Sequence, residues 1–278
     1  MDQARKLIRL AVFGSPVKHS LSPRIHQLFA AQAGISVEYT ATEISEDFLS
    51  REVQKLADAG GTGCNITLPL KNRAFQLANR FSERAELAQA ANTLVFNSAT
   101  RWTADSTDGP GLVRDLLDNL HVELKSRRIC IVGAGGAAAG ILYDLLQQRP
   151  ASLCLFNRTI GKAESLAHRF SEIGRVETGD LEQMTLANPF DLVINATSAG
   201  HHGHNPVLTG NLFGPQSLCY DLSYGAAHDS TRVWCQENGI QCHDGLGMLV
   251  EQAADSFQIW TGFTPDTKPV HQALRTLL

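Results

Sequence analysis

The 278-residue sequence has no excess of basic charge and no hydrophobic run that approaches a membrane span. Its 24 Lys and Arg against 28 Asp and Glu give a net charge of −4, whereas a dedicated nucleic-acid binder carries a basic stripe or domain. A spanning helix needs roughly 18 consecutive apolar residues. The first ten residues also lack the apolar region and cleavage site of a secretory signal peptide. We therefore expect a cytoplasmic protein that binds neither nucleic acid nor membrane.

Paired cysteines are also lacking. None of the six cysteines forms a CxxC pair, and most lie inside apolar runs. We interpret them as reduced, buried small side chains. Cys242 and His243 could supply half of a metal site, but no second pair at ligand spacing accompanies them, and structural zinc needs four ligands. The sequence therefore predicts no metal.

The composition indicates a folded chain of two domains. Hydrophobic residues make up 43% and charged residues 19% of the sequence, which is enough to fill a packed core. At about 150 residues per domain, the length favours two. We predict a substrate-binding domain over residues 1–107, completed by 245–278, and a cofactor-binding domain over 108–244.

In the first region, short apolar runs alternate with helical stretches. Strands are expected over residues 10–14, 63–67 and 92–96. A helix is expected to open at Ser22, with the serine as N-cap and Pro23 at the first helical position, and to end at Gly34.

The second region is typical of a doubly wound parallel sheet, because strands alternate with helices and one of them is continuously apolar. Its expected strands are residues 128–132, 153–156, 191–195 and 218–222, and its expected helices run from the glycine-rich turn to about residue 148 and over 162–170. A last amphipathic helix over 246–260 is expected to return to the first domain. The predicted fold class is thus α/β, with two α/β domains.

A glycine-rich turn joins the strand at 128–132 to the next helix, with Gly133, Gly135, Gly136 and Ala137 in a GxGxxA-like pattern. Glycines allow a backbone to approach a pyrophosphate, and the helix N-terminus offers free N–H groups. The motif alone is weak, but the strand before it and the helix after it are the context that favours a dinucleotide site. The alternative is a tight turn without a ligand.

The end of the following strand indicates NADP rather than NAD. An NAD site usually places an Asp or Glu about 20 residues after the glycines, whereas this chain has Asn157, Arg158 and Thr159, with Lys162 one turn later. An arginine can bind a 2′-phosphate through charged, bidentate contacts. The alternative is that Arg158 and Lys162 are ordinary solvated charges.

Several separate motifs together resemble the shikimate dehydrogenase family. The segments, in chain order, are GSPVKHSLSP at 14–23, NITLPLK at 65–71, ANTL at 91–94, STDG at 106–109, GAGGA at 133–137, NRT at 157–159, NATS at 195–198, YD at 220–221 and DGLGM at 244–248. They span nearly the whole chain in the family's order. This agreement is more specific than any one motif.

The resemblance implies NADP-dependent interconversion of 3-dehydroshikimate and shikimate. Lys71 and Asp108 would be the catalytic pair beside the reacting C3 oxygen. Five further residues would hold the substrate's carboxylate and hydroxyls: Ser20, Ser22, Thr67, Asn92 and Gln252. The cofactor would be held by the glycine turn, by the group from Asn157 to Lys162, and by Thr197, Leu222 and Gly245.

The chemistry of the residues agrees with this reading. A polyhydroxylated acid needs hydroxyl and amide partners, and hydride transfer to a ketone needs a proton donor. Structural roles compete for each polar residue. Ser22 could only cap a helix, Asn92 could satisfy a turn, Asp108 could be an N-cap, and Gln252 could lie on a solvated helix face.

Two alternatives to the main hypothesis stay open. The enzyme could prefer quinate or another cyclic hydroxy acid, because the same hydroxyl-bearing side chains suit any such ring. The fold could also serve as a non-catalytic module that senses NADP, although retention of both Lys71 and Asp108 speaks against it.

Two departures from the family's usual sequence favour a divergent paralogue: Ser106, which replaces the usual Asn, and the segment after Leu222. A monomer and a homodimer both remain compatible with the sequence.

Overall fold

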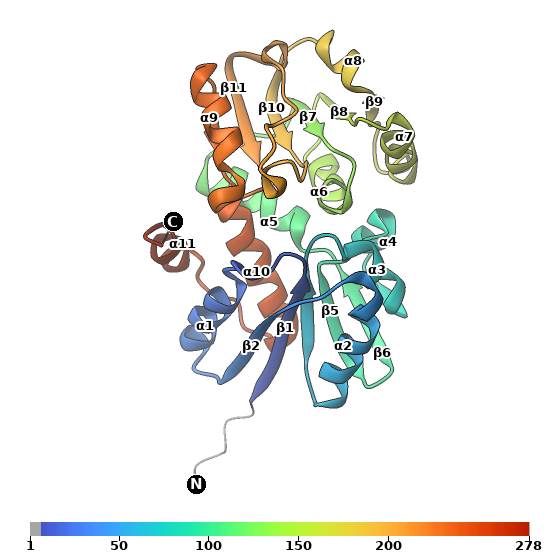
Figure 1. Cartoon of the computed structure of the whole chain (residues 1–278), viewed down its shortest axis with the longest axis vertical. Helices are drawn as coiled ribbons and strands as arrows, with labels where there is room; N and C mark the ends of the chain where they lie inside the picture. The colour runs from blue at the N-terminus through green and yellow to red at the C-terminus, as the bar shows by residue number, and fades with distance from the viewer. Residues whose placement is uncertain (1–6, 278) are drawn as a thin grey trace. The chain divides into compact units, whose positions relative to one another are not determined.

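A computed structural model describes residues 7–277, which form two compact units (Figure 1). One unit runs up to Gly111 and is completed by the residues from Leu249 onward, and the other comprises Leu112–Met248. None of the helices in the described part of the chain combines the length and apolarity needed to cross a bilayer.

The first unit is built on a six-stranded mixed sheet in the order β2-β1-β3-β5-β6-β4. Its strands are β1 (Ile8–Gly14), β2 (Val37–Glu43), β3 (Gly63–Ile66), β4 (Arg80–Phe81), β5 (Thr93–Ser98) and β6 (Arg101–Asp105). Strand β1 pairs in parallel with β2 and β3, whereas β5 is antiparallel to both β3 and β6. Its helices are α1 (Ser22–Ala33), α2 (Glu46–Asp58), α3 (Lys71–Leu77), α4 (Glu83–Ala88) and α11 (Lys268–Arg275), together with most of α10 (Leu246–Thr261).

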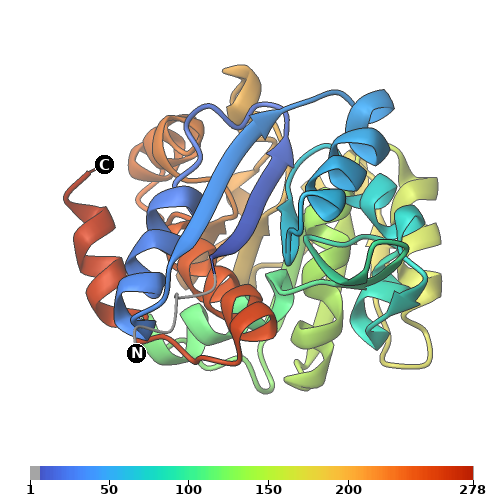
Figure 2. The same ribbon diagram turned by 90° about the horizontal axis from the view of Figure 1, so that it is seen from below.

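Strand β1 is buried on both faces. Its successive side chains enter two different core clusters, because side chains alternate across a strand. Ala11 and Phe13 join a core cluster with side chains of α2 and α3. Leu10 and Val12 face the other way, into a cluster that includes Trp260 of α10. Figure 2 shows α10, in red, running beside the blue strands β1 and β2. Helix α10 therefore returns to the first unit, as the sequence predicts.

The prediction that Ser22 is the N-cap of helix α1 is wrong. The helix already begins at Ser22, its N-cap is Leu21, and no side chain caps it. Leu21 has φ −83° and ψ −7°, which is not the extended backbone that suits a capping serine. The Ser22 backbone N–H instead donates to the Ser20 hydroxyl at 3.3 Å. The predicted end at Gly34 is confirmed, with φ +64° in the left-handed region that glycine favours.

The second unit is a parallel six-stranded sheet in the order β12-β11-β10-β7-β8-β9. The strands are β7 (Arg128–Val132), β8 (Ser152–Phe156), β9 (Glu177–Gly179), β10 (Phe190–Asn195), β11 (Phe213–Asp221) and β12 (Gln241–His243). The helices are α6 (Gly136–Gln147), α7 (Ile160–Arg169), α8 (Leu181–Thr185) and α9 (Asp229–Glu237). Helix α5 (Asp108–Arg114) begins in the first unit and ends in the second, where the π-helical turn η1 (Asp115–Asn119) follows it. Short 3-10 turns complete it: η2 (Gly200–His202), η3 (Gly210–Leu212) and η4 (Gly225–Ala227).

The strand order of this second sheet reverses between β7 and β10, which confirms the predicted doubly wound fold. Ligands of such sheets bind beyond the carboxyl ends of the strands, at the point of reversal. The glycine turn follows β7 directly, and the loop after β10 lies at the same edge. The unit therefore has its predicted cofactor segments where a dinucleotide would bind.

Candidate functional site

A buried ion pair lies at the centre of the polar cluster in the first unit. Lys71 is the first residue of α3, and its Nζ donates to Oδ2 of Asp108 at 2.5 Å. The Lys71 and Asp108 side chains are 14% and 6% exposed. The Lys71 carbonyl accepts the N–H of Ala91, which ties this helix start to the residue next to Asn92.

Asn92 links the ion pair to its surroundings. Its Nδ2 lies 3.0 Å from Oδ1 of Asp108 and 3.0 Å from Oε1 of Gln252. Its Oδ1 accepts the backbone N–H of Thr107 at 2.8 Å. Asn92 and Gln252 are both buried, so the solvated-face interpretation does not describe Gln252, while Asn92 both satisfies the Thr107 backbone and contacts the ion pair. The amide fixes which way the Asp108 carboxylate faces.

The hydrogen bonds continue from Asn92 into a second layer. Asn65 donates to the Asn92 carbonyl at 3.1 Å and to the Ser256 hydroxyl at 3.1 Å. Its Oδ1 accepts the Tyr39 hydroxyl at 2.7 Å. The Ser22 side chain in turn hydrogen-bonds Tyr39. Four of the seven sequence candidates in this unit thus form one network: Lys71, Asp108, Asn92 and Gln252. Ser22 reaches this network through Tyr39 and Asn65.

Ser20 and Thr67 lie outside that network. In the described residues, the Ser20 hydroxyl accepts the Ser22 N–H, and the Thr67 backbone N–H donates to the Phe13 carbonyl at 2.9 Å. Both residues are half-buried. Their hydroxyls remain candidates for direct contact with a substrate: the Ser20 hydroxyl still has its own proton to donate, and in the described residues no hydrogen bond of the Thr67 hydroxyl competes.

Burial keeps the aromatic neighbours of this network uncharged. Burial lowers the pKa of His26 to about 3 and raises the pKa of Tyr39 well above its usual value. The two rings stack with centroids 4.3 Å apart. These two rings therefore add no charge to the network near neutral pH.

The glycine turn of the second unit fits a dinucleotide. Gly133 has φ +111°, and a Cβ there would lie 2.9 Å from the Ala196 carbonyl oxygen, so the position requires glycine. At Gly135 an added Cβ would meet no atom within 4 Å of the described chain, which leaves open space above the backbone. Helix α6 begins at Gly136 with no acidic residue in its first turn. Free N–H groups and open space are what a pyrophosphate needs.

The residues after β8 fit a 2′-phosphate rather than a free ribose hydroxyl. Asn157 accepts the Ala134 N–H at 3.2 Å and donates to the Thr159 carbonyl at 2.8 Å, so it ties this loop to the glycine turn. Arg158 and Lys162 are exposed and form no ion pair with any described residue. Two unneutralised cations beside the turn favour a ligand with an extra phosphate.

Thr197, Leu222 and Gly245 gather at the same edge of the sheet. Thr197 donates both its N–H and its hydroxyl to Oδ1 of Asn195, at 3.2 and 2.8 Å. A Cβ on Gly245 would lie 2.3 Å from the Leu222 carbonyl oxygen, so the two loops touch through backbone. Parallel strands bring their carboxyl ends to one edge, which is why candidates separated by more than twenty residues in the sequence meet here.

Sequence reasoning missed Ser256 and the buried pair of Asp221 and His228. Ser256 lies four residues after Gln252, on the same face of α10, and its hydroxyl contacts Thr93 at 2.8 Å. That i, i+4 spacing could have identified it. His228 Nδ1 lies 3.0 Å from Oδ2 of Asp221. Asp221 is the residue directly before Leu222. No sequence signal distinguishes this histidine from the chain's other nine.

Three family models match consecutive parts of the chain. The model described as the shikimate dehydrogenase substrate binding domain matches residues 12–94. The model described as shikimate / quinate 5-dehydrogenase matches 115–209, and that of the shikimate 5'-dehydrogenase C-terminal domain matches 245–275.

Whole-chain comparisons agree with the family models. The chain is 45% identical over 268 residues to a shikimate dehydrogenase (NADP(+)) of Marinobacter nauticus, covering 96% of this chain and 98% of that protein. It superposes on an Ael1 enzyme from Pseudomonas putida with a TM-score of 0.86 and 41% identity, over 96% and 98% of the two chains. Shikimate 5-dehydrogenase of Thermus thermophilus, in complex with NADP(H) and shikimate, superposes with a TM-score of 0.83 and 29% identity over 98% and 100%.

Proposed function

The chain belongs to the shikimate dehydrogenase family, and we propose that Lys71 and Asp108 are the catalytic pair with which it interconverts 3-dehydroshikimate and shikimate using NADP. In the reducing direction, a ketone, NADPH and a proton give the alcohol and NADP. The observation that carries this proposal is the buried ion pair of Lys71 and Asp108, hydrogen-bonded to Asn92.

Lys71 acts on the oxygen of the reacting carbon. NADPH, when bound, supplies the hydride that the ketone carbon accepts. Lys71 then donates a proton to the oxygen on which negative charge develops, so that no free alkoxide forms. In the oxidising direction the lysine removes the hydroxyl proton. The ammonium also stabilises the developing charge, and this effect is strong because the site is largely buried.

Asp108 and Asn92 prepare Lys71 for this step. The Asp108 carboxylate holds the ammonium through the 2.5 Å contact. Asn92 holds the other carboxylate oxygen, which prevents Asp108 from rotating away. A positioned donor needs no reorganisation when the charge develops. Asn92 therefore serves both the substrate and the orientation of the catalytic pair.

The remaining polar residues suit the rest of a hydroxylated acid. We assign Ser20, Ser22 and Thr67 to the substrate's carboxylate and hydroxyls, together with Asn92 and Gln252. A site that hydrogen-bonds each hydroxyl rejects analogues lacking one, since its own buried polar groups would be left unpaired. The Gln252 amide donates to the Leu249 carbonyl, which fixes its orientation on α10.

In the second unit, we assign the glycine turn to the pyrophosphate of NADP and Arg158 with Lys162 to its 2′-phosphate. Asn157 and Thr159 would hold the loop that carries Arg158. Thr197, Leu222 and Gly245 would lie along the nicotinamide end. The open space at Gly135 and the unpaired charge of Arg158 support this assignment. The six unpaired cysteines support a reducing, cytoplasmic setting.

One assay tests the reaction, the substrate and the cofactor together. Purified protein is given shikimate or quinate with NADP, and the shikimate assay is repeated with NAD, while reduced nicotinamide is followed by absorbance. We expect rapid shikimate-dependent reduction of NADP and little reduction of NAD. Higher kcat/KM for quinate would reassign the substrate, and NADP binding without turnover of either acid would favour the sensing module.

A further inference from the structure

Three cysteine thiols converge in the second unit, and none of them is among the residues assigned to the cofactor. Cys219 lies on β11, Cys242 on the edge strand β12, and Cys235 on α9. Cys219 and Cys242 are aligned partners in the parallel pairing of the two strands. The three sulfur atoms all lie within 4.8 Å of one another. Sheet register and the helix above it thus bring together thiols that are dispersed in the sequence.

The spacing of the thiols matches a metal site closely. A metal bound by thiolates at about 2.3 Å holds its sulfur ligands roughly 3.8–4.0 Å apart. From an upper limit of 4.8 Å, the thiols need to approach by less than about 1 Å, within the reach of side-chain rotation. We propose that Cys219, Cys235 and Cys242 form a three-thiolate binding site for a soft monovalent cation of the Cu(I) type.

The donor set selects this class of metal. Thiolates are soft ligands that prefer Cu(I), zinc and iron–sulfur clusters. A structural zinc ion takes four ligands, and in the described residues no fourth His, Cys, Asp or Glu joins the three thiols. Cu(I) is satisfied by three sulfur ligands in a plane, whereas tetrahedral zinc would need a fourth ligand that the described residues do not supply. Magnesium and calcium prefer oxygen ligands and are excluded by the same argument.

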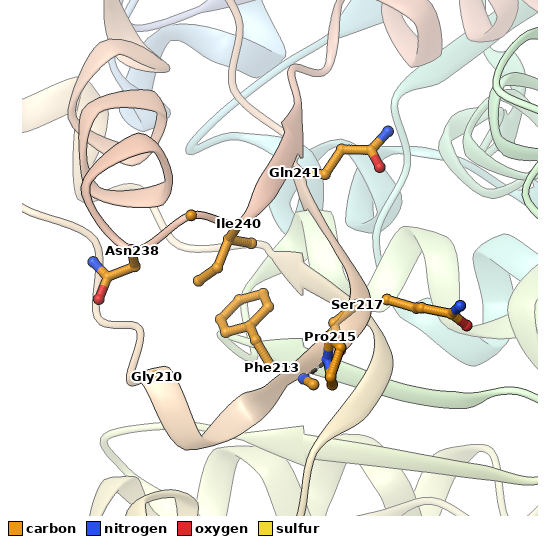
Figure 3. A pocket seen from close by; sticks show the side chains of 10 residues that line it. Gly210, Phe213, Pro215, Ser217, Asn238, Ile240 and Gln241 are labelled. Atoms are coloured by element: carbon orange, nitrogen blue, oxygen red, sulfur yellow. Dashed lines mark hydrogen bonds between the residues drawn. The ribbon is translucent and has the colours of Figure 1, made fainter.

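The site has one accessible ligand. Cys219 and Cys235 are fully buried, whereas Cys242 is partly exposed. A surface pocket lies nearby, with Phe213 and Ile240 turned toward each other across it (Figure 3). Phe213, Ile240 and Cys242 pack against the same core cluster that contains Cys219 and Cys235. Because Cys242 alone of the three is partly exposed, it would be the first ligand that an entering cation meets.

The alternative is that the three cysteines are only small core side chains, since free cysteine is among the most buried residue types. A second group of buried cysteines in the same sheet allows this alternative to be tested. Cys130 and Cys154 are also aligned partners in this sheet and also buried, but no third thiol joins them in the described residues. A generic affinity of buried thiols for metal would appear at both places, whereas the proposed site requires the cluster of three.

The test is Cu(I) binding by the full-length, reduced protein without oxygen, in competition with a chromophoric Cu(I) chelator. We expect one Cu(I) per chain to be retained. X-ray absorption of that sample should show three sulfur neighbours at one distance. Cys242→Ser and Cys235→Ser should each weaken binding at least tenfold. Cys130→Ser should bind within twofold of the unchanged protein.

Dehydrogenase activity without metal is the check that each variant is folded, because none of these cysteines belongs to the proposed catalytic machinery. Cys242→Ser is the decisive variant, since its side chain is partly exposed and its loss disturbs the core least. Three results would overturn the site: release of Cu(I) to the chelator by the unchanged protein, equal weakening by Cys130→Ser, or unchanged binding by Cys242→Ser. Preferential loading by Zn(II) would overturn the assignment to a three-coordinate cation.

Discussion

Lys71 and Asp108 each begin a helix, and their side chains meet at 2.5 Å. A carboxylate at a helix N-terminus is favourable, whereas a cation there opposes the positive end of the helix dipole. Lys71 thus occupies a position that does not help α3, and Asp108 offsets the cost. A lysine serving the fold alone would lie at the other end of the helix. The arrangement favours a chemical role for the pair.

Replacing Lys71 by methionine, which keeps the length of the side chain, should lower kcat at least about 100-fold, the low end of what general acid–base catalysis contributes. KM for shikimate should change little, because the hydroxyl-binding side chains remain. Lys55→Met is the matched control, since the Lys55 side chain is 61% exposed and pairs with Glu52 of its own helix. Near-normal kcat in Lys71→Met would remove the lysine from the mechanism.

The two turn glycines should respond differently to alanine. Gly133→Ala forces a side chain into a backbone of φ +111° and against the Ala196 carbonyl, so we expect a loss of about 1–3 kcal/mol of unfolding free energy. Gly135→Ala should fold normally, because its Cβ meets open space. Its KM for NADP should rise at least roughly tenfold, equivalent to about 1.4 kcal/mol. Thermal melts and NADP titrations separate the two effects, and unchanged NADP affinity in Gly135→Ala would argue against the assigned pyrophosphate site.

Arg158→Ser should weaken NADP much more than NAD. A hydrogen-bonded contact to a charged group contributes about 1.5–3 kcal/mol, so kcat/KM with NADP should fall roughly 10- to 100-fold while the value with NAD stays nearly constant. Arg175→Ser is the control, because Arg175 is an exposed arginine of the same unit that pairs with Glu177. Equal losses with both cofactors would show that Arg158 does not contact the 2′-phosphate.

The regular parts of the fold were predictable because their signals are local. A few neighbouring residues are enough to predict the conformation of the apolar strand β7, of the glycine turn after it and of the left-handed Gly34. The order of the strands in the first sheet was not predictable in this way. Antiparallel β5 and β6 separate β3 from β4, and pairing between strands distant in sequence depends on packing rather than on local pattern.

The site shows the same division. Lys71, Asp108 and Asn92 were found through their motifs, and the structure shows that they touch. The contributions of Gln252 and Ser256 depend on a helix that returns some 160 residues later to Asn92, and those of Tyr39 and Asn65 depend on the pairing of β2 and β3 with β1. The cysteine cluster lay beyond sequence analysis for the same reason: Cys219 and Cys242 become neighbours only through the register of β11 and β12.

His26 should make the protein less stable in acid. Burial lowers its pKa to about 3 in the folded state, against 6.5 when exposed. The unfolded chain therefore binds a proton that the folded chain refuses, and stability rises with pH across this window. The contribution is fully present above pH 6.5 and is lost as the pH falls toward 3, at about 1.4 kcal/mol per pH unit. Urea unfolding of the unchanged protein at pH 7 and pH 5 should show this loss, added to that of the carboxylates.

His26→Phe isolates the effect, because phenylalanine fills the aromatic stack against Tyr39 without a titratable nitrogen. Whatever its effect on stability at pH 7, the variant should lose about 2 kcal/mol less between pH 7 and pH 5 than the unchanged protein, since that interval covers about 1.5 pH units below the unfolded pKa. His168→Gln, at an exposed position, should keep the original pH dependence. Equal losses in His26→Phe and the unchanged protein would mean that His26 accepts a proton in the folded state, which its burial in the aromatic cluster opposes.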